Sequence, residues 1–353
     1  MQPSIPFLAR LRAFAMILTT LLLATACNKN DNAGPSDPVK GLNIIIQDQY
    51  ESLPSRVSIF FKVQDNRGNP IAGLTEENFT IYEKGRNDDK ERILSEDEAT
   101  RVLSDNRVVF RFHTVLLLDL SASVLNGSLD QLKAGARKFV GDILDQENNT
   151  SADVGIWYFD GQDKIHSLVN FTNDKQVLEN AIDRIQPNIS SDSSTDLFGA
   201  IIKSVRLAEN KLGENQLQEI LSAASIVVFT DGTDQAARYA KQEAYDAVDK
   251  APEDIYFYTI GLGNEIDTKV LERIGKTSSV YASDTEALTA KFQEIATVIT
   301  AEADSYYLFE YCTPKRDGSG VNELHLFLEA QGGRGRRITT FDATGFEADC
   351  DLD

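Results

Sequence analysis

The stretch Thr114–Ser123 decides the fold. It reads TVLLLDLSAS, a continuous apolar run followed at once by acidic and hydroxyl side chains. Such a run is typical of a strand buried on both faces, and strands of this kind belong to parallel sheets covered by helices. In open sheets of that class, ligands bind beyond the carboxyl ends of the strands. Asp119, Ser121 and Ser123 therefore lie where a binding site is expected.

The residues that follow alternate between strands and helices as far as about Ala303. We expect strands at Val154–Phe159, Ile165–Phe171, Ser225–Phe229 and Ile255–Ile260. We expect helices at Ser128–Leu144, Leu197–Ala208, Asp234–Val248, Ile266–Ile274 and Thr285–Thr300, the first of them capped by Ser128. Repeated strand–helix units predict an α/β domain over residues 113–304, with a doubly wound and mostly parallel sheet.

Both flanks of this unit have the pattern of β structure. Before it, strands are expected at Leu42–Ile46, Val57–Val63 and Phe79–Tyr82, and the charged segment Arg86–Arg101 is expected to be a loop. After it, strands are expected at Tyr306–Tyr311, Leu324–Glu329 and Arg337–Phe341. We predict that residues 41–112 and 305–353 form one smaller β-sandwich, into which the α/β unit is inserted.

The N-terminus has the pattern of a secretory signal, and residues 1–26 are predicted to be a signal peptide. Arg10 and Arg12 precede an apolar run, and small residues then lead to Cys27. This junction resembles a bacterial lipobox, which implies cleavage before Cys27 and lipidation of that cysteine. Residues 27–40 would then be a tether on the cell envelope, at the outer membrane by analogy. A plain secreted protein with a coincidental cysteine is the alternative.

Two cysteines remain once Cys27 is assigned to the lipid anchor. Cys312 and Cys350 both lie in the C-terminal region. In an exported chain, an even remainder indicates a disulfide, and two free thiols are the less favoured alternative.

The net charge of −20 disfavours nucleic acid as a partner, because an acidic surface repels phosphates. The basic cluster Arg334–Arg337 lies among glycines and is predicted to be a hairpin turn. It offers no extended basic face of the kind that nucleic-acid binding requires.

Three segments remote in sequence place oxygen side chains at one edge of the predicted sheet. Asp119, Ser121 and Ser123 follow the first strand, Thr195 lies in a polar loop, and Asp231 follows the strand ending at Phe229. Hard divalent cations prefer such oxygen ligands. Because neutral hydroxyls leave the ion short of negative charge, it would accept a carboxylate from a partner. We expect Mg²⁺ as the cofactor, with Ca²⁺ or Mn²⁺ as alternatives.

These segments carry a family resemblance. Val115–Ser123, Thr195–Leu197 and Val227–Gly232 resemble the von Willebrand factor A-type (VWA) domain, over about Thr114 to Ala303. The resemblance implies a metal-ion-dependent adhesion site of five residues. Ser121, Ser123 and Thr195 would contact the metal directly, and Asp119 and Asp231 mainly through water. One departure is the run Ser190–Ser194, where many members of the family have a glycine-rich stretch.

The remaining patterns point away from other chemistry. His113, His166 and His325 are scattered without the spacing of metal ligands, and Ile266 takes the place of the third glycine of a dinucleotide-binding fingerprint. We therefore predict a non-enzymatic surface lipoprotein that binds a protein or matrix ligand through its metal, with no small-molecule substrate. The alternatives are an envelope assembly or scaffolding factor and a metal-dependent hydrolase. The hydrolase is disfavoured by the lack of a candidate general base.

Overall fold

A computed structural model describes residues 41–105, 110–144, 151–218, 220–316, 320–348 and 350–352. These residues belong to one compact unit. The predicted signal peptide, Cys27 and the tether lie outside the described residues. No helix among the described residues is both long and apolar enough to cross a membrane.

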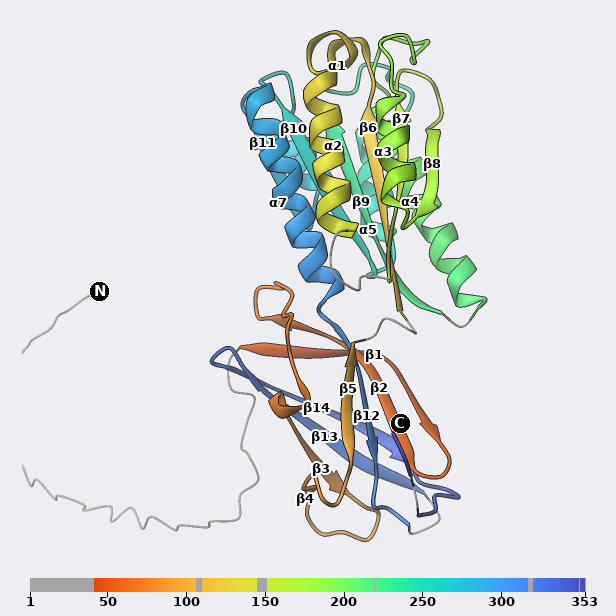
Figure 1. Cartoon of the computed structure of the whole chain (residues 1–353), viewed down its shortest axis with the longest axis vertical. Helices are drawn as coiled ribbons and strands as arrows, with labels where there is room; N and C mark the ends of the chain where they lie inside the picture. The colour runs from red at the N-terminus through yellow and green to blue at the C-terminus, as the bar shows by residue number, and fades with distance from the viewer. Residues whose placement is uncertain are drawn as a thin grey trace, which may run out of the picture. The chain divides into compact units, whose positions relative to one another are not determined.

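A six-stranded sheet forms the centre of the α/β region, with the order β11-β10-β9-β6-β7-β8 (Figure 1). All neighbours pair in parallel except β7 and β8, which are antiparallel. The strands are β6 (Phe110–Asp119), β7 (Ala152–Phe159), β8 (His166–Thr172), β9 (Leu221–Thr230), β10 (Ile255–Leu262) and β11 (Ser278–Ala282). This arrangement confirms the predicted fold class.

Helices cover both faces of this sheet. The elements α1 (Ala122–Gly127), α2 (Leu129–Leu144), α3 (Lys175–Asp183) and α7 (Thr285–Ala303) lie on one face. The other face is covered by α4 (Leu197–Gln216), α5 (Lys241–Lys250) and α6 (Thr268–Ile274). Successive side chains of a strand point to opposite faces. Leu116 and Leu118 accordingly pack against the first helix layer, and Val115 and Leu117 pack against the second.

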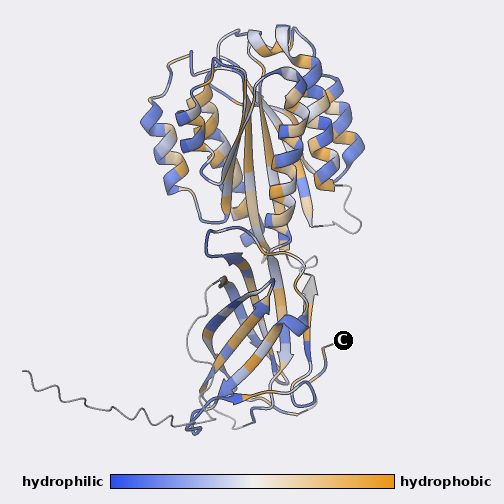
Figure 2. Cartoon of the chain, turned by 90° about the vertical axis from the view of Figure 1, so that its left-hand side faces the viewer, coloured by the Kyte–Doolittle hydropathy of each residue, from blue (hydrophilic) through white to orange (hydrophobic). Residues whose placement is uncertain are grey.

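Two antiparallel sheets with the orders β1-β2-β12-β5 and β14-β13-β3-β4 form the second region. Their strands are β1 (Leu42–Ser52), β2 (Arg56–Asp65), β3 (Phe79–Lys84), β4 (Arg92–Ile93), β5 (Arg101–Asp105), β12 (Tyr306–Cys312), β13 (Val321–Ala330) and β14 (Gly333–Asp342), with the 3₁₀ turn η1 (Glu76–Asn78) before β3. Strands from the two ends of the chain pair directly, β2 with β12 and β3 with β13. Figure 2 shows apolar residues recurring along the strands of both regions.

A disulfide joins Cys312, at the end of β12, to Cys350, with 5.7 Å between the Cα atoms. It closes a loop that contains β13 and β14. The C-terminal segment is therefore linked covalently to the sheet that also contains β1 and β2.

Several element boundaries differ from the predictions. The predicted helix at Asp234–Val248 begins only at Lys241, because Ala237 has a positive φ of 51° that a right-handed helix does not contain. Ser128 directly precedes α2 and its carbonyl accepts the N–H of Leu132 at 2.9 Å, so the predicted start of this helix is right, but its hydroxyl does not cap the first turn. Ser128 lies between α1 and α2, and its hydroxyl contacts the carbonyl of Val124 at 3.5 Å.

Other elements were absent from the prediction or were misplaced. The helices α1 and α3 and the strand β11 were not predicted. The segment Arg86–Arg101 contains the short strand β4 and the first residue of β5 as well as loop. Arg334–Arg337 lies within β14, and the hairpin turn precedes it at Gln331 and Gly332, both of which have positive φ.

Candidate metal site

The first loop of the site follows β6, where Asp119 ends the strand and Ser121 precedes α1. Asp119 is fully buried, and its Oδ1 accepts the backbone N–H of Ser121 at 2.9 Å. Ser121 occupies the N-cap position of α1, but its hydroxyl makes no capping hydrogen bond. Its Oγ instead lies 3.2 Å from Oγ of Ser123. The two hydroxyls therefore lie side by side in the loop after β6.

The second loop follows β9 and is joined to the first by side chains. Oγ of Ser123 donates to Oδ1 of Asp231 at 2.8 Å. Thr230, the last residue of β9, donates from Oγ1 to Oδ2 of Asp119 at 2.6 Å. Because β6 and β9 are parallel neighbours, their carboxyl ends bring these two loops together.

Thr195 lies in the third loop, which is held between the other two by backbone hydrogen bonds. The carbonyl of Thr195 accepts from Gln235 and Ala236 in the segment after Asp231, at 2.8 and 3.0 Å. The carbonyl of Ser193 accepts from Ala122 at 3.1 Å. Thr195 is almost fully buried at the N-terminal side of α4. The structure thus gathers all three predicted loops at the carboxyl ends of the central strands.

Burial dominates the electrostatics of the two aspartates. It raises the pKa of Asp119 to about 6, a shift that the hydrogen bonds from Thr230 and Ser121 oppose. Burial also raises the pKa of Asp231, where the hydrogen bond from Ser123 acts in the opposite direction and the charge of Glu265 adds to the rise. Among the described contacts, neither carboxylate has a basic partner. The site therefore holds negative charge that a cation would compensate.

A hard divalent cation fits this set of side chains. Within the described part of the chain, no group of three or more His, Cys, Asp or Glu side chains is placed to hold a metal. A cation here would depend on hydroxyl oxygens, and two of these already lie together beside a carboxylate. Oxygen donors of this kind suit Mg²⁺, Ca²⁺ or Mn²⁺ better than soft metals.

The structure adds supporting residues that the sequence analysis did not name. Thr230 orients Asp119 through its hydroxyl. The sequence could have indicated this residue, because it directly precedes Asp231. Arg238 donates from Nε to the carbonyl of Gly161 at 2.7 Å and so links the segment after β9 to the loop after β7. Asp160, directly after β7, is fully buried beside the Thr195 loop. The sequence could have indicated Asp160, because a charged residue that directly follows an apolar strand lies at the edge where the site is expected.

A cavity of about 240 Å³ lies beside the loop that contains Asp231. Its lining residues come from the start of α4, the turn after Asp231 and the first turn of α6, and they include Leu197, Phe198, Gly232, Asp234 and Val270. Two further charged residues line it, Lys241 at the start of α5 and Asp267 directly before α6.

Residues 114–295 match the von Willebrand factor type A domain family. Because the match spans more than half of the 353 residues, the chain belongs to this family. The family mediates protein–protein interactions through a metal-ion-dependent adhesion site that commonly binds a divalent cation. Its domains are mostly non-catalytic interaction modules.

Solved structures with this fold are similar to the chain at low sequence identity. The conserved hypothetical protein BatB of Bacteroides thetaiotaomicron is 19% identical with a TM-score of 0.41, covering 53% of this chain and 98% of that one. The VWA domain of the type V pilus tip protein Mfa5 of Porphyromonas gingivalis is 14% identical with a TM-score of 0.42, covering 54% and 95%. A von Willebrand factor type A protein of Catenulispora acidiphila is 10% identical with a TM-score of 0.44, covering 89% and 76%. No curated protein matches the sequence.

Proposed function

We propose that this protein binds a protein partner through a divalent cation held by Asp119, Ser121, Ser123, Thr195 and Asp231. The observation that supports this most directly is the position of Ser123. Its hydroxyl lies within hydrogen-bonding distance of both Ser121 and Asp231, which belong to loops after two different strands. A cation beside these oxygens would be bound through neutral hydroxyls, and its remaining charge would attract a carboxylate of the partner.

The neighbouring cavity supports a role in partner recognition. A partner side chain next to the metal-bound carboxylate would reach the space beside Gly232 and Phe198. Such a second contact would give selectivity among acidic ligands, because a carboxylate alone distinguishes poorly between partners.

The proposed role is binding and not catalysis. Among the described residues, the polar contacts of Asp119 and Asp231 are with hydroxyl groups and with backbone or acidic groups. Binding is also the usual role of this family, whose domains are mostly non-catalytic interaction modules.

The cation is tested by titrating purified protein with Mn²⁺ and then displacing it with Mg²⁺. Saturable binding by the wild type and its loss in Asp119→Ala are expected. Asp163→Asn is a matched control, because Asp163 lies near the same rim but pairs with Lys203 and Tyr239. Equal binding by wild type and Asp119→Ala contradicts the proposed site.

The partner is tested by affinity capture from envelope extract with Mg²⁺, with chelator and with Asp119→Ala. Capture that depends on Mg²⁺ and on Asp119 is expected, and capture indifferent to both rules out metal-mediated binding. The same capture experiment also tests the alternative role as an envelope assembly factor, which would bind a different partner through the same site.

We further propose that the chain is anchored by lipid on Cys27 in a bacterial cell envelope, at the outer membrane. The support is the sequence of the N-terminus, with a basic region, an apolar run and small residues before Cys27. Cys27→Ser is expected to release the protein from the membrane fraction. A variant that stays in that fraction contradicts the anchor without affecting the metal proposal.

A further inference from the structure

Asp160 is a fully buried carboxylate directly after β7, and it is not one of the five proposed metal ligands. Its Oδ1 accepts the backbone N–H of Gln162 at 2.9 Å. Its Oδ2 lies 2.8 Å from Oγ of Ser190, which donates to it. Its carbonyl accepts the backbone N–H of Asp196 at 2.9 Å. Asp160 therefore contacts both ends of the loop that contains Thr195.

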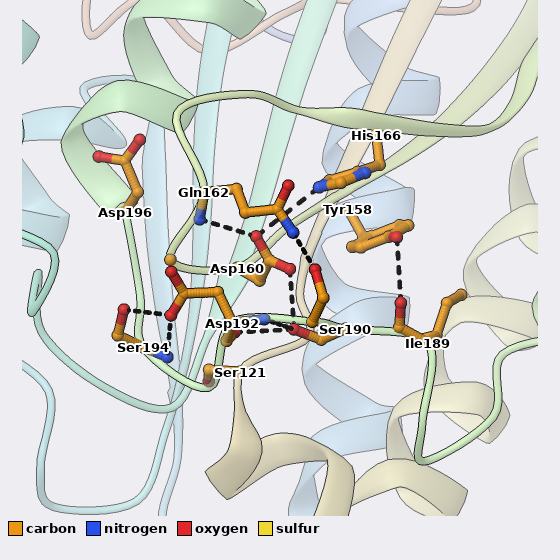
Figure 3. Close-up of polar contacts among 12 residues, drawn as sticks. Ser121, Tyr158, Asp160, Gln162, His166, Ile189, Ser190, Asp192, Ser194 and Asp196 are labelled. Carbon is orange, nitrogen blue, oxygen red and sulfur yellow. Dashed lines mark hydrogen bonds and ion pairs between the residues drawn. The ribbon is translucent and has the colours of Figure 1, made fainter.

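The loop between these two contacts is also bonded within itself. Oγ of Ser190 lies 2.7 Å from the carbonyl of Asp192, and Asp192 accepts from both the backbone and the hydroxyl of Ser194 at 3.1 and 2.8 Å. Figure 3 shows Ser190, Asp192 and Ser194 side by side, with Asp160 against them and Ser121 close by. Ser190 and Asp196 are thus two of the points that fix this loop, together with the backbone hydrogen bonds at Ser193 and Thr195.

The loop after β7 approaches this segment so closely that only glycine fits at position 161. A Cβ atom on Gly161 would lie 2.0 Å from Oγ of Ser194 and 2.3 Å from Oδ1 of Asp192. Gln162, the next residue, also contacts the hydroxyl of Ser191. The loop after β7 is therefore packed against the Thr195 loop over several consecutive residues.

Among the described residues, no lysine or arginine forms an ion pair with Asp160. The nearest imidazole is His166, whose Nε2 is 3.6 Å from Oδ1 of Asp160 and whose ring stacks on Tyr158 at 4.4 Å. Burial lowers the pKa of His166, although the charge of Asp160 acts in the opposite direction, so the ring is neutral at neutral pH. Hydrogen bonds to Gln162 and Ser190 are thus the contacts that fix the carboxylate.

We propose that Asp160 is a positioning residue of the metal site, which holds Thr195 in place through Ser190 and Asp196. This inference rests on the proposed function, since it concerns the same site. Residues that orient metal ligands without touching the ion often matter for affinity nearly as much as the ligands themselves. Asp160 acts through its hydrogen bonds, and its charge is not required.

Two substitutions separate hydrogen bonding from charge. Asp160→Asn removes the charge but keeps an oxygen for Gln162, and its amide can donate to Oγ of Ser190. Ser190 can then give its single proton to the carbonyl of Asp192, which already lies 2.7 Å away. Asp160→Ala removes both side-chain contacts, with Gln162 and with Ser190, and keeps the carbonyl that accepts from Asp196. Ser190→Ala removes the contact with Asp160 from the other side. Asp163→Asn is the control, since Asp163 follows β7 as well but bonds to Lys203 and Tyr239.

The first measurement is hydrogen exchange of residues 190–196 in the presence of chelator, which needs no metal. We expect faster exchange in Asp160→Ala and Ser190→Ala, and exchange like that of the wild type in Asp160→Asn and Asp163→Asn. The second measurement is the affinity for Mn²⁺. It is expected to fall about 10-fold to 100-fold in Asp160→Ala and Ser190→Ala, as for other residues that support metal ligands. It should stay close to the wild-type value in the two Asn variants.

Other results overturn the inference. If Asp160→Asn loses as much affinity as Asp160→Ala while its loop stays protected, the charge of Asp160 is what matters. Unchanged exchange and affinity in Asp160→Ala also contradict positioning. If circular dichroism shows that Asp160→Ala does not fold, the comparison of Ser190→Ala with Asp160→Asn decides. If the wild type binds no Mn²⁺, the proposed function fails, and hydrogen exchange alone still reports whether Asp160 holds the loop.

Discussion

The hydroxyl of Thr230 donates a 2.6 Å hydrogen bond to Oδ2 of Asp119, the buried carboxylate at the end of the neighbouring strand. The other oxygen of Asp119 accepts the backbone N–H of Ser121. Both oxygens are therefore held by protein donors, and the orientation of the carboxylate is fixed before any ligand arrives. This geometry is consistent with a carboxylate that acts on a cation mainly through water.

Thr230→Val should weaken the affinity for Mn²⁺ about 10-fold. This is the lower end of the loss in affinity that is typical when a residue hydrogen-bonded to a metal ligand is replaced. Valine has nearly the same shape but cannot donate to Asp119. The hydrogen bond from Thr230 lowers the pKa of Asp119, so its loss also raises the competition from protons. Isothermal titration of wild type and variant with Mn²⁺ measures the effect. Thr233→Val, an exposed threonine in the same segment, is the control and should bind as the wild type does.

The stability of the metal-free protein should fall as the pH rises from about 4 to above 6. Burial raises the pKa of Asp119 from 3.8 to about 6, so the folded chain prefers the protonated form. The contribution of Asp119 to the free energy of unfolding is fully present below its ordinary pKa of 3.8. It is lost as the pH rises past the raised pKa of about 6. The loss is about 3 kcal/mol. Thermal unfolding in chelator between about pH 4 and pH 8 measures it.

Asp119→Asn serves as the reference in this experiment, because it removes the titrating group while retaining its shape. The difference in melting temperature between wild type and variant should change with pH in chelator. Saturating Mg²⁺ should stabilise the wild type most above pH 6, where Asp119 is ionised and able to balance the cation. A pH-independent difference between the two proteins contradicts the assignment to Asp119.

The central sheet and the convergence of the three loops could be predicted because both depend on local patterns. Four consecutive apolar residues before Asp119 indicate a strand buried on both faces, and parallel strands bring their carboxyl ends to one edge. The same reasoning applies to Asp231 after β9. Placing Asp119 and Asp231 therefore needed only the strands and the residues that follow them, whereas Thr195 precedes α4 and was placed by its polar loop and the family resemblance.

One wrong boundary involves a contact with a distant residue. Asp234 looks like a helix start, but its carboxylate accepts the N–H of Phe198, 36 residues away. Only the folded chain brings these two residues together. The missed helix α3 is different, since Asp174 accepts the N–H of Val177 as a local cap before the apolar residues Leu178 and Ile182. That signal was present in the sequence and was overlooked.

Loss of the disulfide should destabilise the region that contains β12 and β13. Cys312 and Cys350 are 38 residues apart, and a loop of that length stabilises by about 4 kcal/mol when its closure restricts the unfolded chain. The double variant Cys312→Ser/Cys350→Ser should therefore unfold at lower urea concentration, while its affinity for Mn²⁺ stays unchanged. The wild type treated with reductant should behave like the variant. A midpoint unaffected by either treatment contradicts a stabilising disulfide.

Lys62 and Glu302 form an ion pair that is buried inside the protein. Lys62 lies in β2 and Glu302 in the last turn of α7, and their side chains are only 6% and 3% exposed. Nζ of Lys62 also contacts the hydroxyl of Tyr256 at 3.1 Å. Lys62→Met leaves the Glu302 carboxylate buried without its partner, which should cost about 3–5 kcal/mol of unfolding free energy.

The double variant Lys62→Met/Glu302→Met should recover most of that loss, because two apolar side chains of similar size remove both charges together. Urea unfolding of wild type, both single variants and the double variant gives the coupling energy. The exposed pair Lys250–Asp246, with side chains 79% and 47% exposed, is the control and should show coupling below about 0.5 kcal/mol. A coupling of that small size for Lys62 and Glu302 would mean that the buried charges are stabilised by groups other than each other.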